Sequence, residues 1–70
     1  MATIDQAVLL ELDLHPHSTV EELSDRLRSE VHAVRRWLRA HEGWLVVREA
    51  MGQARWRLSP LGERFLAALD

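Results

Sequence analysis

Apolar residues at helical spacing predict a first helix over residues 4–14. The run Thr3-Ile4-Asp5-Gln6 is a capping box at its start, and Pro16 limits its end. Its apolar positions form two stripes: Ile4, Val8 and Leu12 on one side, and Ala7, Leu10 and Leu14 on the other. A helix that is apolar over so wide an arc is usually covered on two sides. In a chain of 70 residues, we expect the second cover to be another subunit.

Two further helices are predicted, over about residues 20–27 and 30–41. A second capping box, which begins at Thr19, starts the earlier one. Its inward residues are Val20, Leu23 and Leu27. The later helix starts at Glu30, which we expect to cap it and whose charge suits the helix dipole. Gly43 marks its end, because glycine is common just beyond helix C-termini.

After Gly43 the pattern changes to one typical of β-strands. Residues 44–50 and 54–59 are rich in β-branched and aromatic side chains, and residues 51–53 supply a turn with an uncharged tip, so a β-hairpin is predicted. In the second strand, alternation places two pairs on opposite faces: Trp56 and Leu58 on one, Arg55 and Arg57 on the other.

A fourth helix begins with Ser59 as its N-cap and Pro60 at its first position, and runs to the end of the chain. One of its faces carries Leu61, Phe65, Ala68 and Leu69. The sequence therefore predicts a single α+β domain over residues 1–70, with the order helix, helix, helix, strand, strand, helix.

Composition limits the class of protein. With no cysteine, the chain has neither a disulfide nor a thiolate site. No apolar run approaches the roughly 20 residues of a membrane-spanning helix, and the N-terminus lacks a basic signal-peptide region, so we expect a cytoplasmic protein without a membrane partner.

The net charge of −2 conceals an uneven distribution. Residues 1–25 hold six acidic residues and no basic one, whereas residues 26–57 hold eight of the nine arginines and three acidic residues. A basic centre beside acidic ends indicates a two-sided molecule, one face of which suits an anionic partner.

The 30–41 helix concentrates this positive charge on one side. At 100° per residue, its core-facing arc is Val31, Val34, Trp37, Leu38 and His41. The opposite side holds His32, Arg35, Arg36 and Arg39, with Ala33 and Ala40 beside them. The arginines therefore form a row over two helical turns that contains no acidic residue.

The element order resembles the winged helix-turn-helix domains of bacterial transcription regulators of the MarR, PadR and ArsR kinds. The stretch TVEELSDRLRSEVHAVRRWLRAHEGWLVV resembles their helix–turn–recognition helix block, with Leu23, Leu27, Val34 and Leu38 at the core spacing of that fold. The stretch RWRLSPLGERFLAAL is similar to their wing strand and following helix. In the turn, Arg28 replaces the glycine that is usual in these domains.

The resemblance implies a transcription regulator that binds double-stranded DNA, with the 30–41 helix in the major groove and the hairpin wing at about residues 44–59 on the backbone. Arg35 and Arg36 are then the candidates for base contacts, supported by His32. The candidates for phosphate contacts are Arg39, Arg28, Arg55 and Arg57.

Other interpretations stay open. The arginine row is otherwise a solvated surface, and the same fold also serves as a protein-interaction module or binds nucleic acid without sequence preference. The apolar surplus of the 4–14 helix predicts a homodimer through that helix, with the C-terminal helix as a further candidate. Two-fold symmetry then favours half-sites about 10 bp apart, or a multiple of that spacing.

The remaining residues point to structural roles. We expect Trp37, Trp44 and Trp56 in the core, with Trp44 and Trp56 paired across the hairpin, and His41 as a buried histidine with its hydrogen bonds satisfied. The serines look like cap or turn residues: Ser18, Ser24, Ser29 and Ser59. The His15-Pro16-His17 run lacks the cysteine or carboxylate spacing of a metal site. No catalytic motif is visible, so neither an enzyme nor a cofactor is expected.

Overall fold

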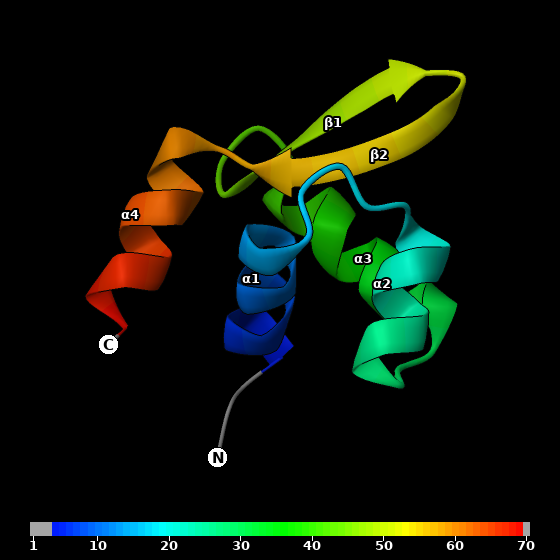
Figure 1. Ribbon diagram of the computed structural model, residues 1–70, viewed down its shortest axis with the longest axis horizontal. Coiled ribbons are helices and arrows are strands. Elements are labelled where there is room, and N and C mark those ends of the chain that lie inside the picture. The colour runs from blue at the N-terminus through cyan, green and yellow to red at the C-terminus, as the bar shows by residue number, and fades with distance from the viewer. Residues whose placement is uncertain (1–3, 70) are drawn as a thin grey trace.

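The computed structural model describes residues 4–69, except for the side chains of residues 50 and 51. In this part of the chain, four helices and a two-stranded antiparallel hairpin follow one another in the predicted order (Figure 1). Their bounds are Ile4–Leu14 (α1), Val20–Leu27 (α2), Val31–His41 (α3), Val46–Met51 (β1), Gln53–Leu58 (β2) and Pro60–Ala68 (α4). The α+β class and the element order are confirmed. The capping box predicted at Thr3 lies outside the described residues.

Local hydrogen bonds set two of the helix starts. At α2, the Glu22 N–H donates to Thr19 Oγ1 (3.1 Å) and the Thr19 N–H donates to Glu22 Oε1 (2.8 Å), which completes the predicted capping box. At α4, the Gly62 N–H donates to Ser59 Oγ (2.9 Å). At α3 the expectation of a capping side chain is wrong: Glu30 is the N-cap residue, but its side chain makes no capping bond. Glutamate lacks the short side chain of the residues that favour this position.

Arg28 makes the turn between α2 and α3 in a left-handed conformation, with φ 53° and ψ 43°. Its N–H donates to Asp25 O (3.3 Å), and the next N–H, that of Ser29, donates to Ser24 O (3.0 Å). These bonds satisfy carbonyls at the end of α2, as glycine-terminated helices commonly do. A side chain in this conformation carries a steric cost that glycine avoids.

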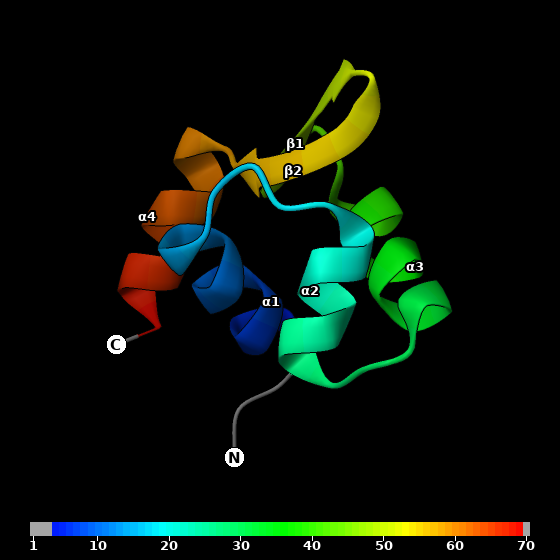
Figure 2. The same ribbon diagram turned by 45° about the vertical axis from the view of Figure 1, so that its right-hand side comes forward.

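The core joins the inner sides of α1, α2 and α3 to one face of the hairpin, which lies above the helices in both views (Figures 1 and 2). Its buried apolar residues are Val8, Leu9, Leu12, Leu23, Val34, Trp37, Leu38, Leu45, Val46, Trp56 and Leu58. The predicted core positions of α2, Trp37 on α3, and the inward pair Trp56 and Leu58 on β2 are confirmed, with Val20 and Leu27 packed at the rim.

The segment between α1 and α2 is joined to the edge of the hairpin. The Trp56 N–H donates to Ser18 O (2.7 Å), and the Ser18 N–H donates to Trp56 O (3.1 Å). This pair of bonds lies outside the two-stranded sheet and fixes the start of α2 against β2. It was not expected from the sequence, because an isolated bridge has no periodicity.

The first strand begins two residues later than predicted, and Trp44 lies before it in a turn. His41 O accepts from both the Trp44 N–H and the Leu45 N–H (3.1 Å each), so the chain turns once more after α3. Leu45 is buried and Trp44 is 52% exposed, so the expectation of a core Trp44 is wrong. Trp56 lies opposite Arg48 rather than Trp44 in the hairpin register.

Two other boundaries differ from the prediction. α3 ends at His41 and is followed by an extended Glu42, so Gly43 does not cap it; Gly43 instead adopts φ 81° in the next turn. The hairpin turn is tighter than expected, because β1 and β2 pair up to residues 51 and 53, with only Gly52 between them at φ 78°. A positive φ is readily available to glycine at both places.

α4 packs with Gly62 buried and Leu66 against the core. A Cβ on Gly62 would lie 2.1 Å from Leu45 O, so only glycine permits this approach. The predicted apolar face of α4 points outward, with Leu61, Phe65 and Leu69 between 39% and 47% exposed. On α1, the exposed large apolar residues are Ile4, Leu10 and Leu14. Within residues 4–69, no helix combines the length and apolar character needed to cross a membrane.

Candidate functional site

α3 has one buried side and one exposed side, close to the predicted division. Val34, Trp37 and Leu38 are buried, while Val31 and His41 are half-buried at the edges of that side. The exposed side carries the predicted set of His32, Arg35, Arg36 and Arg39. The structure thus brings these four side chains together on one surface of one helix.

The positive charge of this row is not compensated within the described part of the chain. α3 itself contains no acidic residue, and no acid among residues 4–69 forms an ion pair with Arg35, Arg36 or Arg39. Clustered like charges repel one another, so an anionic partner would lower the free energy of this surface.

The buried side of α3 is held in place by directional contacts as well as by packing. The Trp37 indole N–H donates to Asp5 Oδ1 on α1. The His41 ring stacks on Trp37 at 4.1 Å between centroids, and its Nδ1 donates to Trp37 O (2.8 Å), since a carbonyl can only accept. The exposed Trp44 stacks on the other side of His41 at 5.6 Å. These contacts fix the rotation of α3, and therefore the direction of its arginine row. They also satisfy a hydrogen bond of His41, as expected, although the ring is only half-buried.

A cleft of about 220 Å³ lies between α3, the start of α2 and the hairpin. Its charged lining residues are Arg35, Arg39, Arg48 and Glu21. Sequence reasoning did not select Arg48. Its signal was the alternation of β1, which places Arg48 on the same face as the buried Val46 and therefore toward the helices.

Arg28 lies in a second, more open hollow between α2 and the start of α3. The lining residues of this hollow are Glu21, Ser24, Asp25, Arg28, Ser29 and Val31. Glu21 and Asp25 line this hollow together with Arg28, so two carboxylates lie near its charge.

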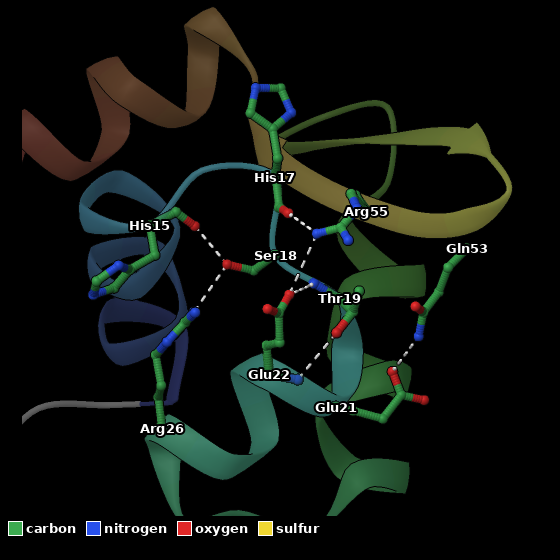
Figure 3. A network of polar contacts seen from close by, with 9 residues as sticks. All are labelled: His15, His17, Ser18, Thr19, Glu21, Glu22, Arg26, Gln53 and Arg55. Atoms are coloured by element: carbon green, nitrogen blue, oxygen red, sulfur yellow. Dashed lines mark hydrogen bonds and ion pairs between the residues drawn. The ribbon is translucent and has the colours of Figure 1, made fainter.

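The two hairpin arginines that were predicted to contact phosphate are bound to other groups of the chain. Arg55 Nη1 donates to His17 O (2.9 Å) and lies 3.6 Å from Glu22 Oε1 (Figure 3). Arg57 Nε donates to Glu49 Oε1 (2.5 Å). Both arginines lie on the hairpin face opposite Trp56, so they do not share the cleft with Arg35 and Arg39.

Glu22 is the centre of the polar network at the start of α2 (Figure 3). The backbone N–H of Thr19 lowers the pKa of its carboxyl below the ordinary value of 4.5, and the Thr19 hydroxyl and the charges of Arg55 and Arg26 act in the same direction, against desolvation. Nearby, Arg26 Nη1 donates to Ser18 Oγ (2.9 Å), which in turn donates to His15 O (2.5 Å).

His17 and the four serines named from the sequence contact groups of the chain itself. His17 Nδ1 lies 3.5 Å from Glu49 Oε1, and no three His, Asp or Glu side chains of residues 4–69 gather as metal ligands. Ser18, Ser29 and Ser59 are bonded to nearby backbone, as expected of cap and turn residues. For Ser24 that expectation is wrong, because it lies inside α2 and its Oγ donates to Val20 O (2.8 Å). Comparison of the chain with protein-family models, curated proteins and solved structures finds no match in any of the three.

Proposed function

We propose that this protein is a winged helix-turn-helix DNA-binding protein that regulates transcription. The observation that carries the proposal is the arginine row of α3, defined as Arg35, Arg36 and Arg39 with His32. This row is exposed, its arginines form no ion pair with any acid of residues 4–69, and the buried opposite side of the helix sets its direction. In this proposal α3 enters the major groove, whose width admits a helix, and the hairpin flanks the sugar-phosphate backbone.

Within the row, position along the helix divides the roles. Arg35 and Arg36 lie nearer the helix start and are proposed to contact guanine edges, which accept two hydrogen bonds from an arginine. Arg39, one turn beyond Arg35, and Arg28, in the turn before α3, are proposed to contact phosphates. Arg55 and Arg57 can also contact phosphates, but only if each exchanges its glutamate carboxylate for a phosphate.

A salt titration tests the proposal. The protein is titrated onto random duplex DNA at about 50 mM and about 200 mM salt, and we expect affinity to fall steeply, because each phosphate contact releases counterions. Arg36→Ala should weaken binding to a site selected from a random DNA library by about 1–3 kcal/mol. Arg64→Ala on α4 is the matched control, because it removes the same charge from an exposed helix position away from α3 and should leave binding unchanged.

Two outcomes contradict this function. Absence of binding at roughly 50 mM salt would remove DNA as the partner. If Arg36→Ala and the native protein bind the selected site equally well, the arginine row is a solvated surface that does not contact DNA.

The second candidate function is a protein-interaction module on the same fold. Two observations favour it. Trp44 and several apolar residues of α1 and α4 are exposed, and three hairpin arginines are already paired with glutamates. A protein without DNA affinity that captures a defined partner through α1 and α4 would fit this candidate instead.

A further inference from the structure

The cleft between α3 and the hairpin brings together three arginines from two elements. Arg35 and Arg39 are four residues apart on α3, so their side chains are neighbours on one helix face. Arg48 lies directly opposite Trp56 in the hairpin register, and directly opposed residues share one face of a sheet. Because Trp56 is buried toward the helices, Arg48 also points to the α3 side.

The charges of this cleft are only partly balanced. Glu42 Oε2 lies 3.5 Å from Arg48 Nε, and Glu21 is the acidic residue among the lining residues. Glu21 Oε2 accepts from Gln53 Nε2 (3.5 Å) at the rim (Figure 3). The lining as a whole therefore carries three positive charges and one negative charge.

Most of the remaining lining residues are apolar, and they affect how strongly the arginines attract an anion. They include Val20, Ala54 and Trp56, and Trp56 is only 4% exposed. Beside an apolar wall an ion is less fully surrounded by water, which makes the attraction between arginine and an anion stronger than on a flat, fully solvated surface. The volume of about 220 Å³ is below the roughly 300–1,000 Å³ of sites for larger organic ligands, so it suits a small anion.

We propose that this cleft is a phosphate-binding site, with Arg39 and Arg48 as facing ligands and Arg35 beside them. The planar guanidinium pairs with two phosphate oxygens at once, and arginines from two elements can hold one phosphate from two sides. The phosphate belongs either to a nucleic-acid backbone or to a free polyphosphate or phosphate ester. The site goes beyond the proposed function, since it does not require α3 to contact bases.

Calorimetric titration of the whole protein with inorganic tripolyphosphate at low salt tests the site. We expect one binding event per chain, weakened about tenfold or more in Arg39→Ala and in Arg48→Ala, as loss of a charge-assisted hydrogen bond implies. Glu42→Gln should tighten binding, because it releases Arg48 from its carboxylate partner. Arg64→Ala on α4, which removes the same charge from an exposed helix position outside the cleft, is the control and should bind nearly as the native protein does. All the substituted residues are exposed, and circular dichroism verifies that each variant is folded.

A duplex-DNA arm separates the two sources of phosphate. If Arg48→Ala also weakens DNA binding and tripolyphosphate competes with DNA, the cleft holds a backbone phosphate. If tripolyphosphate binds through the cleft but the protein does not bind DNA, the ligand is a free phosphate compound. The same follows if Arg48→Ala leaves DNA binding unchanged. Either result supports the site.

Three results would overturn it. The first is no tripolyphosphate binding by the native protein. The second is equal weakening by the Arg64→Ala control, which would indicate diffuse attraction. The third is equally tight binding of polyglutamate, which would show that the cleft does not select phosphate.

Discussion

At the residue scale, the arginines differ in what they touch. Those of α3 face solvent without a carboxylate partner among the described residues, whereas Arg48, Arg55 and Arg57 each lie within 3.6 Å of a glutamate oxygen. Exposed ion pairs contribute only about 0–1 kcal/mol, so these glutamates can give way to a phosphate at small cost. Phosphate contact by the hairpin arginines therefore remains a prediction that requires each to leave its glutamate. The α3 arginines have no such partner among the described residues.

Arg28 supplies a residue-scale prediction about stability. Its φ of 53° imposes a steric cost that glycine does not have, although glycine gains entropy in the unfolded chain. We expect Arg28→Gly to raise the free energy of unfolding by about 0.5–1 kcal/mol, measured by urea denaturation.

Arg28→Ala is the matched control, because it removes the same charge but keeps a β-carbon, and it should not stabilise the protein. If both variants have the same stability, the left-handed turn is not the source of the strain. If Arg28 contacts phosphate, both variants should lose the same DNA affinity despite their different stabilities.

At the element scale, the starts of α2 and α4 depend on residues within one turn. α2 begins with reciprocal bonds between Thr19 and Glu22, and α4 begins with the bond from the Gly62 N–H to Ser59 Oγ. α3 lacks a side-chain cap and depends on its buried side and on the bond between Trp37 and Asp5. The helix proposed to bind DNA is thus held by tertiary contacts, whereas α2 is also fixed by local ones.

The α2 cap gives a prediction about pH. Because the folded-state pKa of Glu22 is lowered, its contribution to stability is present above about pH 4.5 and is lost as the pH falls through the lowered folded-state value. Glu22→Gln should remove this part of the acid sensitivity while retaining the bond to the Thr19 N–H, since glutamine also completes a capping box.

Urea denaturation at about pH 3 and about pH 7 measures this effect. The native protein should lose more stability on acidification than Glu22→Gln does. Glu22→Ala, which loses the carboxyl and the return bond together, should be the least stable of the three at neutral pH. An unchanged pH dependence in Glu22→Gln would contradict the role of this carboxylate.

At the scale of the whole molecule, the arginine row and the exposed apolar residues of α4 lie on different helices. In both views α1 lies between α4 and α3, so the helix that carries the apolar row and the helix that carries the arginine row lie on opposite sides of α1 (Figures 1 and 2). The α4 row consists of Leu61, Phe65 and Leu69 and contains no charge, so two copies can meet along it without opposing like charges. Association there leaves both arginine rows open.

The homodimer predicted through α1, with α4 as the further candidate, stays a prediction, and the exposed apolar residues of both helices allow it to be tested. Phe65→Glu should give a monomer in sedimentation equilibrium, because two facing carboxylates would be placed in an apolar contact. Ala40→Glu, which adds the same charge to the exposed side of α3, should remain dimeric. A native protein that sediments at its chain mass of 8.1 kDa would rule out this self-association.

The sequence by itself determined the features that depend on neighbours along the chain. The element order, the caps at Thr19 and Ser59, and the two sides of α3 follow from helical periodicity and from hydrogen bonds within one turn. Only the tertiary structure decided that Trp44 is exposed, that Arg48 joins the α3 arginines, and that Ser18 pairs with Trp56. These features depend on the turn after α3 and on contacts between segments that lie far apart in the chain, which are the approach of the hairpin to α3 and the bridge at the edge of β2.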